Sequence, residues 1–276
     1  MLKKRLIFTL LYNQGQFVLS RNFRLQKVGD LDWLQTNYNF SKISFSIDEL
    51  LVLDVTRGER DTGAFCDTLK ALTQGCFVPI AAGGGVRSIE HARALLRSGA
   101  DKVVVNTALY ENTGFIAELA SEFGQQCVVA SMDVKRTPDG NYRVMAECGG
   151  KALEGDAREW IERVTNQGVG ELYLNSIERD GTGQGYDMQM LDLLPPVMPI
   201  PVILAGGVGN SSHLAEGIAD ARVDATATAH LFNFVGDGLK QARHSLVASG
   251  VDLPVWDVRQ LDIILDRGEQ AGGRVD

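Results

Sequence analysis

The chain has 276 residues, of which 45% are hydrophobic and 22% are charged, and its formal net charge is -8 with a pI ≈ 5.1. This balance is ordinary for a globular protein and excludes wholesale disorder, collagen-like repeats and a membrane bundle. The chain lacks the excess of positive charge that is typical of nucleic-acid-binding proteins, so neither nucleic acid nor an anionic membrane surface is an expected partner.

The N-terminus begins with a basic cluster and an apolar run, an arrangement that mimics a signal peptide. Lys3, Lys4 and Arg5 precede the apolar stretch 6–12. That stretch is short for a signal sequence, and no small-residue cleavage pattern follows it. We therefore predict a first β-strand here, and no other stretch approaches transmembrane length.

Short β-branched apolar runs then alternate with amphipathic stretches along the chain. Strands are expected at 6–12, 49–55, 78–82, 102–106, 127–133, 171–176, 201–205 and 225–229, and helices at 88–97, 114–123, 156–167, 211–218 and 239–249. Eight strands with helices between them predict parallel βα units. The continuous apolar run 50–53 fits a sheet that is buried on both faces.

Cysteines are scattered through these elements. Cys66, Cys76, Cys127 and Cys148 show no CxxC spacing, which argues against a zinc site and against a disulfide scaffold. We expect reduced thiols in a cytoplasmic protein, with no metal and no cofactor.

The two halves of the chain resemble each other. Residues 78–86 (VPIAAGGGV) resemble residues 200–208 (IPVILAGGV), an offset of 122. The same offset, without adjustment, aligns Glu49 with Glu171, His91 with His213, and 109–110 with 231–232. We predict two fused (βα)4 half-barrels that form one (βα)8 TIM barrel over residues 1–256, followed by an extension at 257–276. A doubly wound sheet is the alternative, but it would not naturally give two equal halves.

Glycines gather where predicted strands end, which is where a (βα)8 barrel keeps its active site. Because glycine has no Cβ, its N–H can approach an oxyanion, and the helix that follows adds its positive end. Tight turns are the plainer alternative explanation. The repeated arrangement predicts two phosphate sites, formed by Gly84, Gly85, Asn106, Thr107, Asp180, Gly181, Gly206, Gly207, Ala229 and His230.

Several motifs together carry a family resemblance. They are DEL at 48–50 with LD at 53–54, GGGVRS at 83–88, GADKV at 99–103, DVKR at 133–136, RDGT at 179–182 with GYD at 185–187, and AGG at 205–207. Across residues 1–255 the chain resembles the cyclase subunit of imidazole glycerol phosphate synthase. The resemblance implies that a glutaminase subunit supplies ammonia through the barrel. It also implies ring closure at the far mouth by two aspartates, on the first and fifth strands.

One of these aspartates is missing. Asp133 matches the fifth-strand position, whereas Leu11 occupies the first-strand position, and the offset of 122 pairs the same two residues. Acid–base chemistry of this kind needs groups that both remove and deliver protons, and leucine cannot exchange one. Other residues that the resemblance marks as departures are Leu19, Asn175, Ala205 and His230. We expect ordinary cyclase activity to be lost.

The opposite mouth keeps the family's residues. The resemblance implies that the glutaminase docks there, with Asp101 as a docking contact, and that ammonia enters through a gate of Arg5, Glu49, Lys102 and Glu171. Alternating charges predict a closed ring of ion pairs, in which each buried charge has two compensating neighbours. A role in stability alone is the alternative for charges at this face.

A gate without the acid–base pair resembles one branch of the family, which also carries a leucine-rich run like Leu10 and Leu11. That branch works with a glutaminase-like partner and a sugar amidotransferase in surface-glycan (O-antigen) biosynthesis. We expect this chain to supply ammonia for amidation of a nucleotide-linked amino sugar. One alternative is an authentic cyclase of histidine biosynthesis that uses Tyr12 or Thr9. Another is a stand-alone isomerase of the kind found in histidine and tryptophan synthesis, which would not need a gate.

Overall fold

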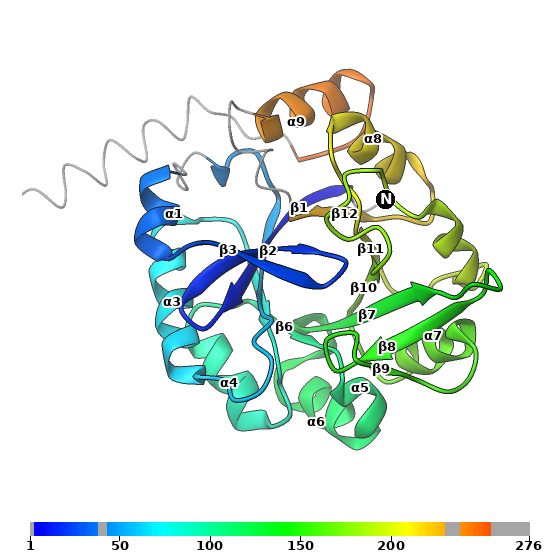
Figure 1. The fold of residues 1–276 in the computed structure, drawn as a ribbon, viewed down its shortest axis with the longest axis horizontal. Helices are drawn as coiled ribbons and strands as arrows, with labels where there is room; N and C mark the ends of the chain where they lie inside the picture. The colour runs from blue at the N-terminus through cyan, green and yellow to red at the C-terminus, as the bar shows by residue number, and fades with distance from the viewer. Residues whose placement is uncertain (1–2, 38–42, 230–237, 255–276) are drawn as a thin grey trace, which may run out of the picture.

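A computed structural model of the chain describes residues 3–37, 43–229 and 238–254. Within these residues eight parallel strands close into a barrel, which confirms the predicted (βα)8 fold (Figure 1). The barrel closes because the last strand pairs in parallel with the first. In order around the barrel, the strands are β1 (Arg5–Asn13), β4 (Glu49–Asp54), β5 (Ile80–Gly83), β6 (Lys102–Val105), β7 (Val128–Arg136), β10 (Glu171–Ser176), β11 (Val202–Ala205) and β12 (Ala225–Thr228).

Helices surround the barrel and cover the outer face of its strands (Figure 1). The five expected helices are present, with small shifts at their ends, as α4 (Ile89–Arg97), α6 (Thr113–Phe123), α7 (Ala157–Thr165), α8 (Ser211–Ala219) and α9 (Gly238–Ala248). Further helical segments were not expected: α1 (Leu31–Asn37), α3 (Thr62–Gly75), α5 (Ala108–Glu111), η1 (Gln125–Cys127) and η2 (Met188–Leu193). The η segments are 3-10 helices.

Two antiparallel extensions at the carboxyl ends of barrel strands were also not expected. β1 continues into β2 (Gln16–Arg21) and β3 (Arg24–Gly29), and β7 continues into β8 (Tyr142–Ala146) and β9 (Lys151–Ala152). At the tip of the β2–β3 hairpin, Asn22 N donates a hydrogen bond to Asp180 O at 2.9 Å. The hairpin therefore reaches from β1 to the loop that follows β10.

The strand registers confirm the internal repeat for most of the barrel and correct it at one strand. β4 pairs Leu50 with Ile80, and β10 pairs Leu172 with Val202, so both residues shift by 122. β5 pairs Ala81 with Lys102, whereas β11 pairs Ile203 with Ala225, so the β12 partner is 123 residues on. The constant offset is therefore wrong at β12, because one extra residue precedes that strand. Residues 231–232 lie outside the described residues.

The C-terminal part of the barrel is anchored by a buried ion pair. Arg243 on α9 donates to Asp48 at 2.7 Å, and Asp48 precedes β4 and accepts a hydrogen bond from Leu6 N. Residues 255–276, which include the predicted extension, lie outside the described part, so the domain boundary stays a prediction. Among the described helices, none combines the length and the apolar character that a membrane crossing requires.

Candidate functional site

The barrel interior is separated from the outer core by the alternation of side chains along each strand. A small inner cluster consists of Ile7, Leu51, Ala81, Val104, Val129, Tyr173, Ile203, Ala205, Ala225 and Ala227. On β1, Leu6, Phe8, Leu10 and Tyr12 belong instead to the larger outer core. The odd-numbered residues of β1 therefore point inward, and the inner cluster is a packed apolar layer between two polar ends.

The N-terminal end of the barrel carries a closed ring of four side chains, which we call the charged ring. Arg5 Nη1 lies 2.7 Å from Glu49 Oε2 and 3.1 Å from Glu171 Oε1. Lys102 Nζ lies 2.9 Å from Glu49 Oε2 and 3.0 Å from Glu171 Oε1. Each residue is the first of its strand, so the four side chains meet at one level. Each positive group contacts both glutamates, as alternation of charge predicts.

Burial shapes the electrostatics of the charged ring. It raises the pKa of Glu49, whose side chain is only 3% exposed, and Lys102 offsets part of this rise. Burial also lowers the pKa of Arg5, but Glu171 and Glu49 outweigh that effect and leave it raised. Because two positive and two negative groups balance, the ring forms a neutral polar closure at this end of the barrel. Its role as a gate stays a prediction.

Asp101, the predicted docking residue, lies exposed beside the charged ring. Its carboxylate accepts a hydrogen bond from Ile80 N at 2.8 Å, which ties β6 to β5. Asp224 accepts from Val202 N at 2.9 Å in the same way, so Asp101 has a structural role whether or not a partner docks.

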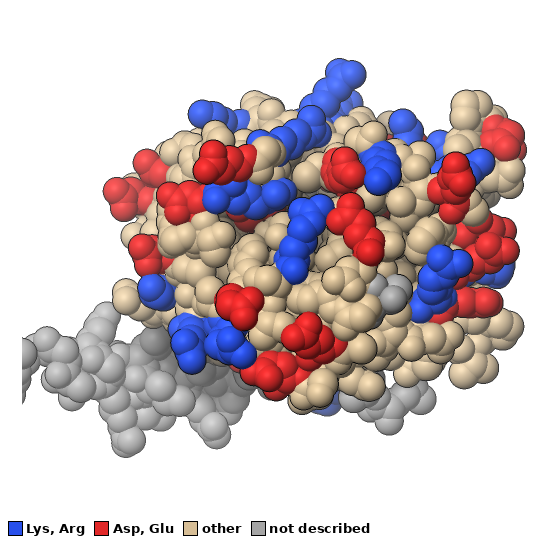
Figure 2. Space-filling view, turned by 90° about the horizontal axis from the view of Figure 1, so that it is seen from below, with Lys and Arg blue, Asp and Glu red and all other residues tan. Residues whose placement is uncertain are grey.

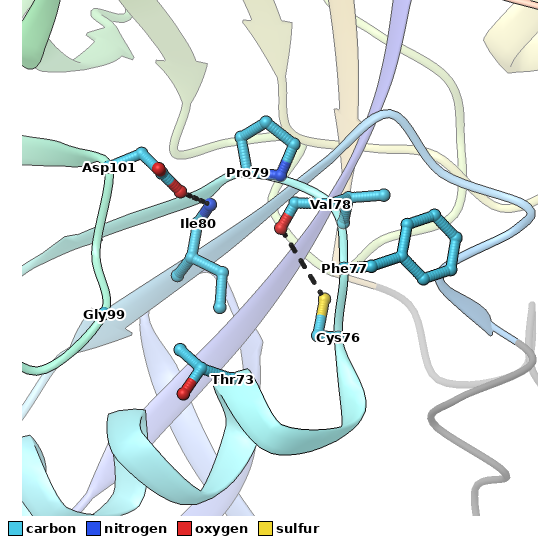
Figure 3. A pocket seen from close by; sticks show the side chains of 8 residues that line it. All are labelled: Thr73, Cys76, Phe77, Val78, Pro79, Ile80, Gly99 and Asp101. Carbon is cyan, nitrogen blue, oxygen red and sulfur yellow. Dashed lines mark hydrogen bonds between the residues drawn. The ribbon is translucent and has the colours of Figure 1, made fainter. Parts of the chain in front are cut away.

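An open pocket of about 270 Å³ lies next to Asp101 (Figure 3). The ring of Phe77, which is 46% exposed, stands at its edge and packs against Phe45 with centroids 4.6 Å apart. The pocket is lined by Thr73, Cys76, Phe77, Val78, Pro79, Ile80, Gly99 and Asp101. An apolar ring, a hollow and a carboxylate therefore share the face that holds the charged ring.

The side wall of the barrel differs from this end. Figure 2, which views the molecule from below relative to Figure 1, shows acidic and basic side chains interspersed over the described residues of that face. Mixed charges of this kind are typical of an ordinary solvated surface. The charged ring, with its closed set of ion pairs, therefore differs from the mixed charges of this side face.

The carboxyl ends of the strands form the second polar end, which we call the mouth. Asp133 on β7 accepts hydrogen bonds from Asn106 Nδ2 and Asn175 Nδ2, each at 2.9 Å. Asn175 is the register partner of Asp133 on β10. Burial raises the pKa of Asp133 to about 6, and the two amides offset part of the rise. A carboxyl that titrates near neutrality suits proton transfer.

The other half of the mouth is apolar. Leu11 on β1 is the register partner of Leu53 on β4, and both side chains are partly exposed. The offset of 122 relates Leu11 to Asp133 and Leu53 to Asn175. In the first half-barrel, two apolar residues therefore occupy the positions that an aspartate and an asparagine occupy in the second. Sequence analysis names Leu53 only as part of the LD motif at 53–54, and its pairing with Asn175 follows from the offset.

The structure also addresses the two substitutes for the missing carboxylate. Tyr12 faces the outer core, where its ring lies 5.1 Å from that of Phe65, so the suggestion that it acts in the mouth is wrong. Thr9 is buried, and its hydroxyl lies beside that of Tyr173, whose pKa it lowers against the effect of burial. Since Thr9 and Leu11 share a face of β1, the Thr9 hydroxyl lies one layer below the mouth.

Asp180 is a second carboxylate near Asp133, close enough to contribute to the raised pKa of that residue. It is held by the β2–β3 hairpin: Phe23 N donates to Asp180 Oδ2 at 3.0 Å and Ser20 Oγ donates at 2.5 Å. A Cβ on Gly181 would lie 1.9 Å from Ser20 O, so the hairpin also packs closely on Gly181. In this structure both residues fasten the hairpin, and their predicted phosphate contact stays a prediction.

The two glycine turns have the conformations that only glycine adopts easily. Gly84 has a φ of 124° and Gly207 a φ of 112°. A Cβ on Gly84 would lie 2.2 Å from Asp54 O, and one on Gly207 would lie 2.1 Å from Gly185 O. Close approach of protein backbone therefore explains these two glycines, as the tight-turn alternative expects. Phosphate binding by them stays a prediction.

The remaining predicted phosphate residues lie around the same mouth. Gly85 and Gly206 complete the two turns with positive φ. Thr107 Oγ1 accepts a hydrogen bond from Glu147 N at 3.2 Å, and Ala229 follows β12. His230 lies outside the described residues.

Arg60 is a cation that sequence analysis missed at the first glycine turn. A Cβ on Gly85 would lie 2.9 Å from Arg60 Nη1, and Arg60 Nε lies 3.7 Å from Asp54 Oδ2. The loop that carries Arg60 gave no motif, so only the folded chain brings it to the turn.

Comparison with known proteins finds one matching family model and a similar protein along nearly the whole chain. Residues 15–236 match the family described as "Histidine biosynthesis protein". The chain is 44% identical over 257 residues to a protein of Parasynechococcus marenigrum (strain WH8102) named "Putative imidazole glycerol phosphate synthase subunit hisF2". That alignment covers 93% of this chain and 95% of the relative.

Proposed function

The chain belongs to the histidine biosynthesis protein family, and from this premise we propose that it is a cyclase-type subunit that delivers ammonia. It would pair with a glutaminase at the N-terminal face of the barrel. The ammonia would serve a sugar amidotransferase that amidates a nucleotide-linked amino sugar in surface-glycan (O-antigen) biosynthesis. The acceptor sugar would be activated by that amidotransferase and not by this chain.

The observation that carries this proposal is the contrast between the two ends of the barrel. The charged ring is complete, with four ion-pair distances from 2.7 to 3.1 Å. At the mouth, Asp133 faces the apolar pair Leu11 and Leu53 where a second proton-transfer group is needed. A polar entrance without an acid–base pair supports ammonia delivery better than ring closure.

A second candidate is an authentic cyclase subunit of imidazole glycerol phosphate synthase in histidine biosynthesis. The name of the 44% identical relative favours it. So does Asp180, which lies near enough to Asp133 to raise its pKa. The β2–β3 hairpin occupies the Asp180 carboxylate, so this candidate requires the hairpin to release it.

Two measurements test the proposal. The chain is co-purified with a candidate glutaminase subunit, and glutamine hydrolysis is compared with and without the chain. We expect stimulation of hydrolysis by the parent chain. Separately, the chain receives the aminoimidazole-carboxamide ribotide substrate of the cyclase and ammonium salt. We expect no turnover above background, and robust turnover would establish the cyclase instead.

A further inference from the structure

The antiparallel extensions of β1 and β7 carry cations that lie directly opposite each other. The β2–β3 ladder pairs Arg21 with Arg24, and the β7–β8 ladder pairs Lys135 with Arg143. All four side chains are exposed, and none makes an ion pair or a side-chain hydrogen bond with another described residue. Like charges that face each other across a ladder destabilise a sheet. The fold itself therefore gives no reason for these two pairs.

The acidic residues of the two extensions leave these cations uncompensated. Residues 11–29 contain no Asp or Glu, although the whole chain has a formal net charge of -8. The acids between 135 and 152 are already engaged, because Asp139 is held by hydrogen bonds within its own turn and Glu147 lies 3.5 Å from Lys151. A local excess of positive charge therefore stands at the mouth of an acidic protein.

The two extensions are in contact and form one surface. A Cβ on Gly149 would lie 2.7 Å from Phe23 Cδ2, so the turn after β8 packs against the tip of the β2–β3 hairpin. Arg57 Nη2 donates to Phe23 O at 2.8 Å, which places a further exposed cation at the tip. Figure 1 shows both extensions in front of the barrel. We call the exposed cations Arg21, Arg24, Arg57, Lys135 and Arg143 the basic rim.

The arginine pair of the basic rim points away from the predicted phosphate residues. Ser20 and Arg21 are consecutive residues of β2, so their side chains point to opposite faces of the hairpin. Since Ser20 Oγ donates to Asp180, Arg21 and its partner Arg24 lie on the face away from Asp180. A small anion needs donors that converge on one point, whereas cations spread over two extensions suit a broad acidic surface.

We propose that the basic rim docks the acidic surface of a partner protein that receives ammonia at the mouth, an interface that rests on the ammonia delivery proposed above. Delivery requires the receiving protein to cover the exit of the barrel, because ammonia would otherwise escape into solvent. Lys135 lies two residues beyond Asp133 on the same face of β7, so the basic rim reaches the edge of this exit. Complementary charge would speed the association and fix its orientation.

A binding measurement with the full chain tests the basic rim. The probe is a fluorescently labelled poly-L-glutamate peptide, and its binding is followed by fluorescence anisotropy at low ionic strength. Replacing Arg21 and Arg24 together by Gln should weaken binding about 3- to 10-fold, the effect of two exposed ion pairs. The double variant Lys135→Gln with Arg143→Gln should weaken it similarly. Added salt should weaken binding by the parent chain, because exposed charges are screened.

Two cations outside the basic rim provide the matched control. Arg97 on α4 and Lys240 on α9 are exposed and make no ion pair within the described residues. Arg97→Gln with Lys240→Gln removes the same net charge as either rim variant, and should keep the parental affinity. Urea unfolding adds a second readout: a rim variant should be as stable as the parent or slightly more stable, because it removes a like-charge pair. A rim variant less stable than the control would show that the cations serve the fold, and would overturn the proposal.

The remaining outcomes separate this interface from the function on which it rests. Equal affinities of the rim and control variants would overturn the interface. Displacement of the peptide by inorganic pyrophosphate, or rim-dependent binding to phosphatidylglycerol vesicles, would do the same, since the occupant would then be a small phosphate or a membrane. Should rim-dependent peptide binding hold while the parent chain fails to stimulate a candidate glutaminase, the interface stands and ammonia delivery fails. Should the parent stimulate that glutaminase without rim-dependent binding, delivery stands and the interface is refuted.

Discussion

The raised pKa of Asp133 predicts that its charge reduces the stability of the fold at neutral pH. Burial moves the pKa from 3.8 to about 6 in the folded chain. As pH rises, the unfolded chain releases this proton first, so the folded state loses stability between these two values. Each pKa unit corresponds to about 1.4 kcal/mol, which gives about 3 kcal/mol above pH 6 as an upper bound. Since the carboxyl is partly exposed, solvent screening reduces the expected loss to about 1–3 kcal/mol.

Asp133→Asn removes the charge and should recover this stability. The unpaired Asn106 Oδ1 can accept from the new amide after rotation of its own amide group, so the hydrogen-bonded pair can be kept. We expect the variant to be more stable than the parent by about 1–3 kcal/mol at pH 8, with the difference approaching zero near pH 4. Urea unfolding at pH 4, 6 and 8 measures both values.

Asp139→Asn is the matched control. Hydrogen bonds from Thr137 and Asn141 lower the pKa of exposed Asp139, the opposite direction to Asp133. The stability that this carboxylate contributes is present above its unfolded pKa and lost as pH falls, so the control variant should gain nothing at pH 8. If Asp133→Asn is less stable than the parent at pH 8, or differs by the same amount at every pH, the reasoning about burial is wrong.

Two further predictions concern the charged ring and the first glycine turn. Lys102→Met leaves Glu49 and Glu171 with one cation fewer and should cost about 3 kcal/mol in urea unfolding. Adding Glu49→Gln should restore part of that loss, and no restoration would mean that the ring is not electrostatically coupled. Gly84→Ala places a Cβ 2.2 Å from a backbone oxygen at a φ of 124°, and should cost about 3 kcal/mol. Gly140→Ala, with a φ of 85° and nothing within 4 Å, should cost only about 1 kcal/mol, and equal losses of thermal stability would refute the clash.

The barrel was predictable because its strands are short apolar runs whose spacing repeats. The helix α3 was missed although its buried Phe65, Leu69 and Leu72 follow helical spacing and Asp61 caps its first turn. Its glycines and threonines obscured a pattern that propensity alone does not favour. The β2–β3 hairpin was missed for a different reason. Its anchor, Asp180, is far away in sequence, and no local pattern encodes such a contact.

The residues of the candidate site also fall into those that the sequence could predict and those that depend on contacts between distant segments. The four residues of the charged ring were predicted from the family resemblance, and the structure explains why they meet, because each is the first residue of its strand. The hydrogen bonds of Asn106 and Asn175 to Asp133 were not, because they depend on how three neighbouring strands bring side chains together. The Asp180 carboxylate was assigned to a ligand from its motif. The structure shows this carboxylate hydrogen-bonded to the β2–β3 hairpin, a contact that the motif does not encode, and its phosphate contact stays a prediction.

The two half-barrels differ at the mouth in a pair of register partners and not in one residue alone. Asp133 has Asn175 as its register partner and amide donor, whereas Leu11 has Leu53 in the equivalent place. A carboxylate restored at position 11 alone would stand beside an apolar side chain without an amide to stabilise its charge, and its pKa would be raised. Leu11→Asp together with Leu53→Asn is therefore the smallest change that rebuilds in the first half-barrel what the second half retains. Leu53 belongs to the LD motif at 53–54 that the chain shares with the family, so Leu11 is the departure at this pair, and activity restored by Leu11→Asp alone would show that the amide at the second position is not needed.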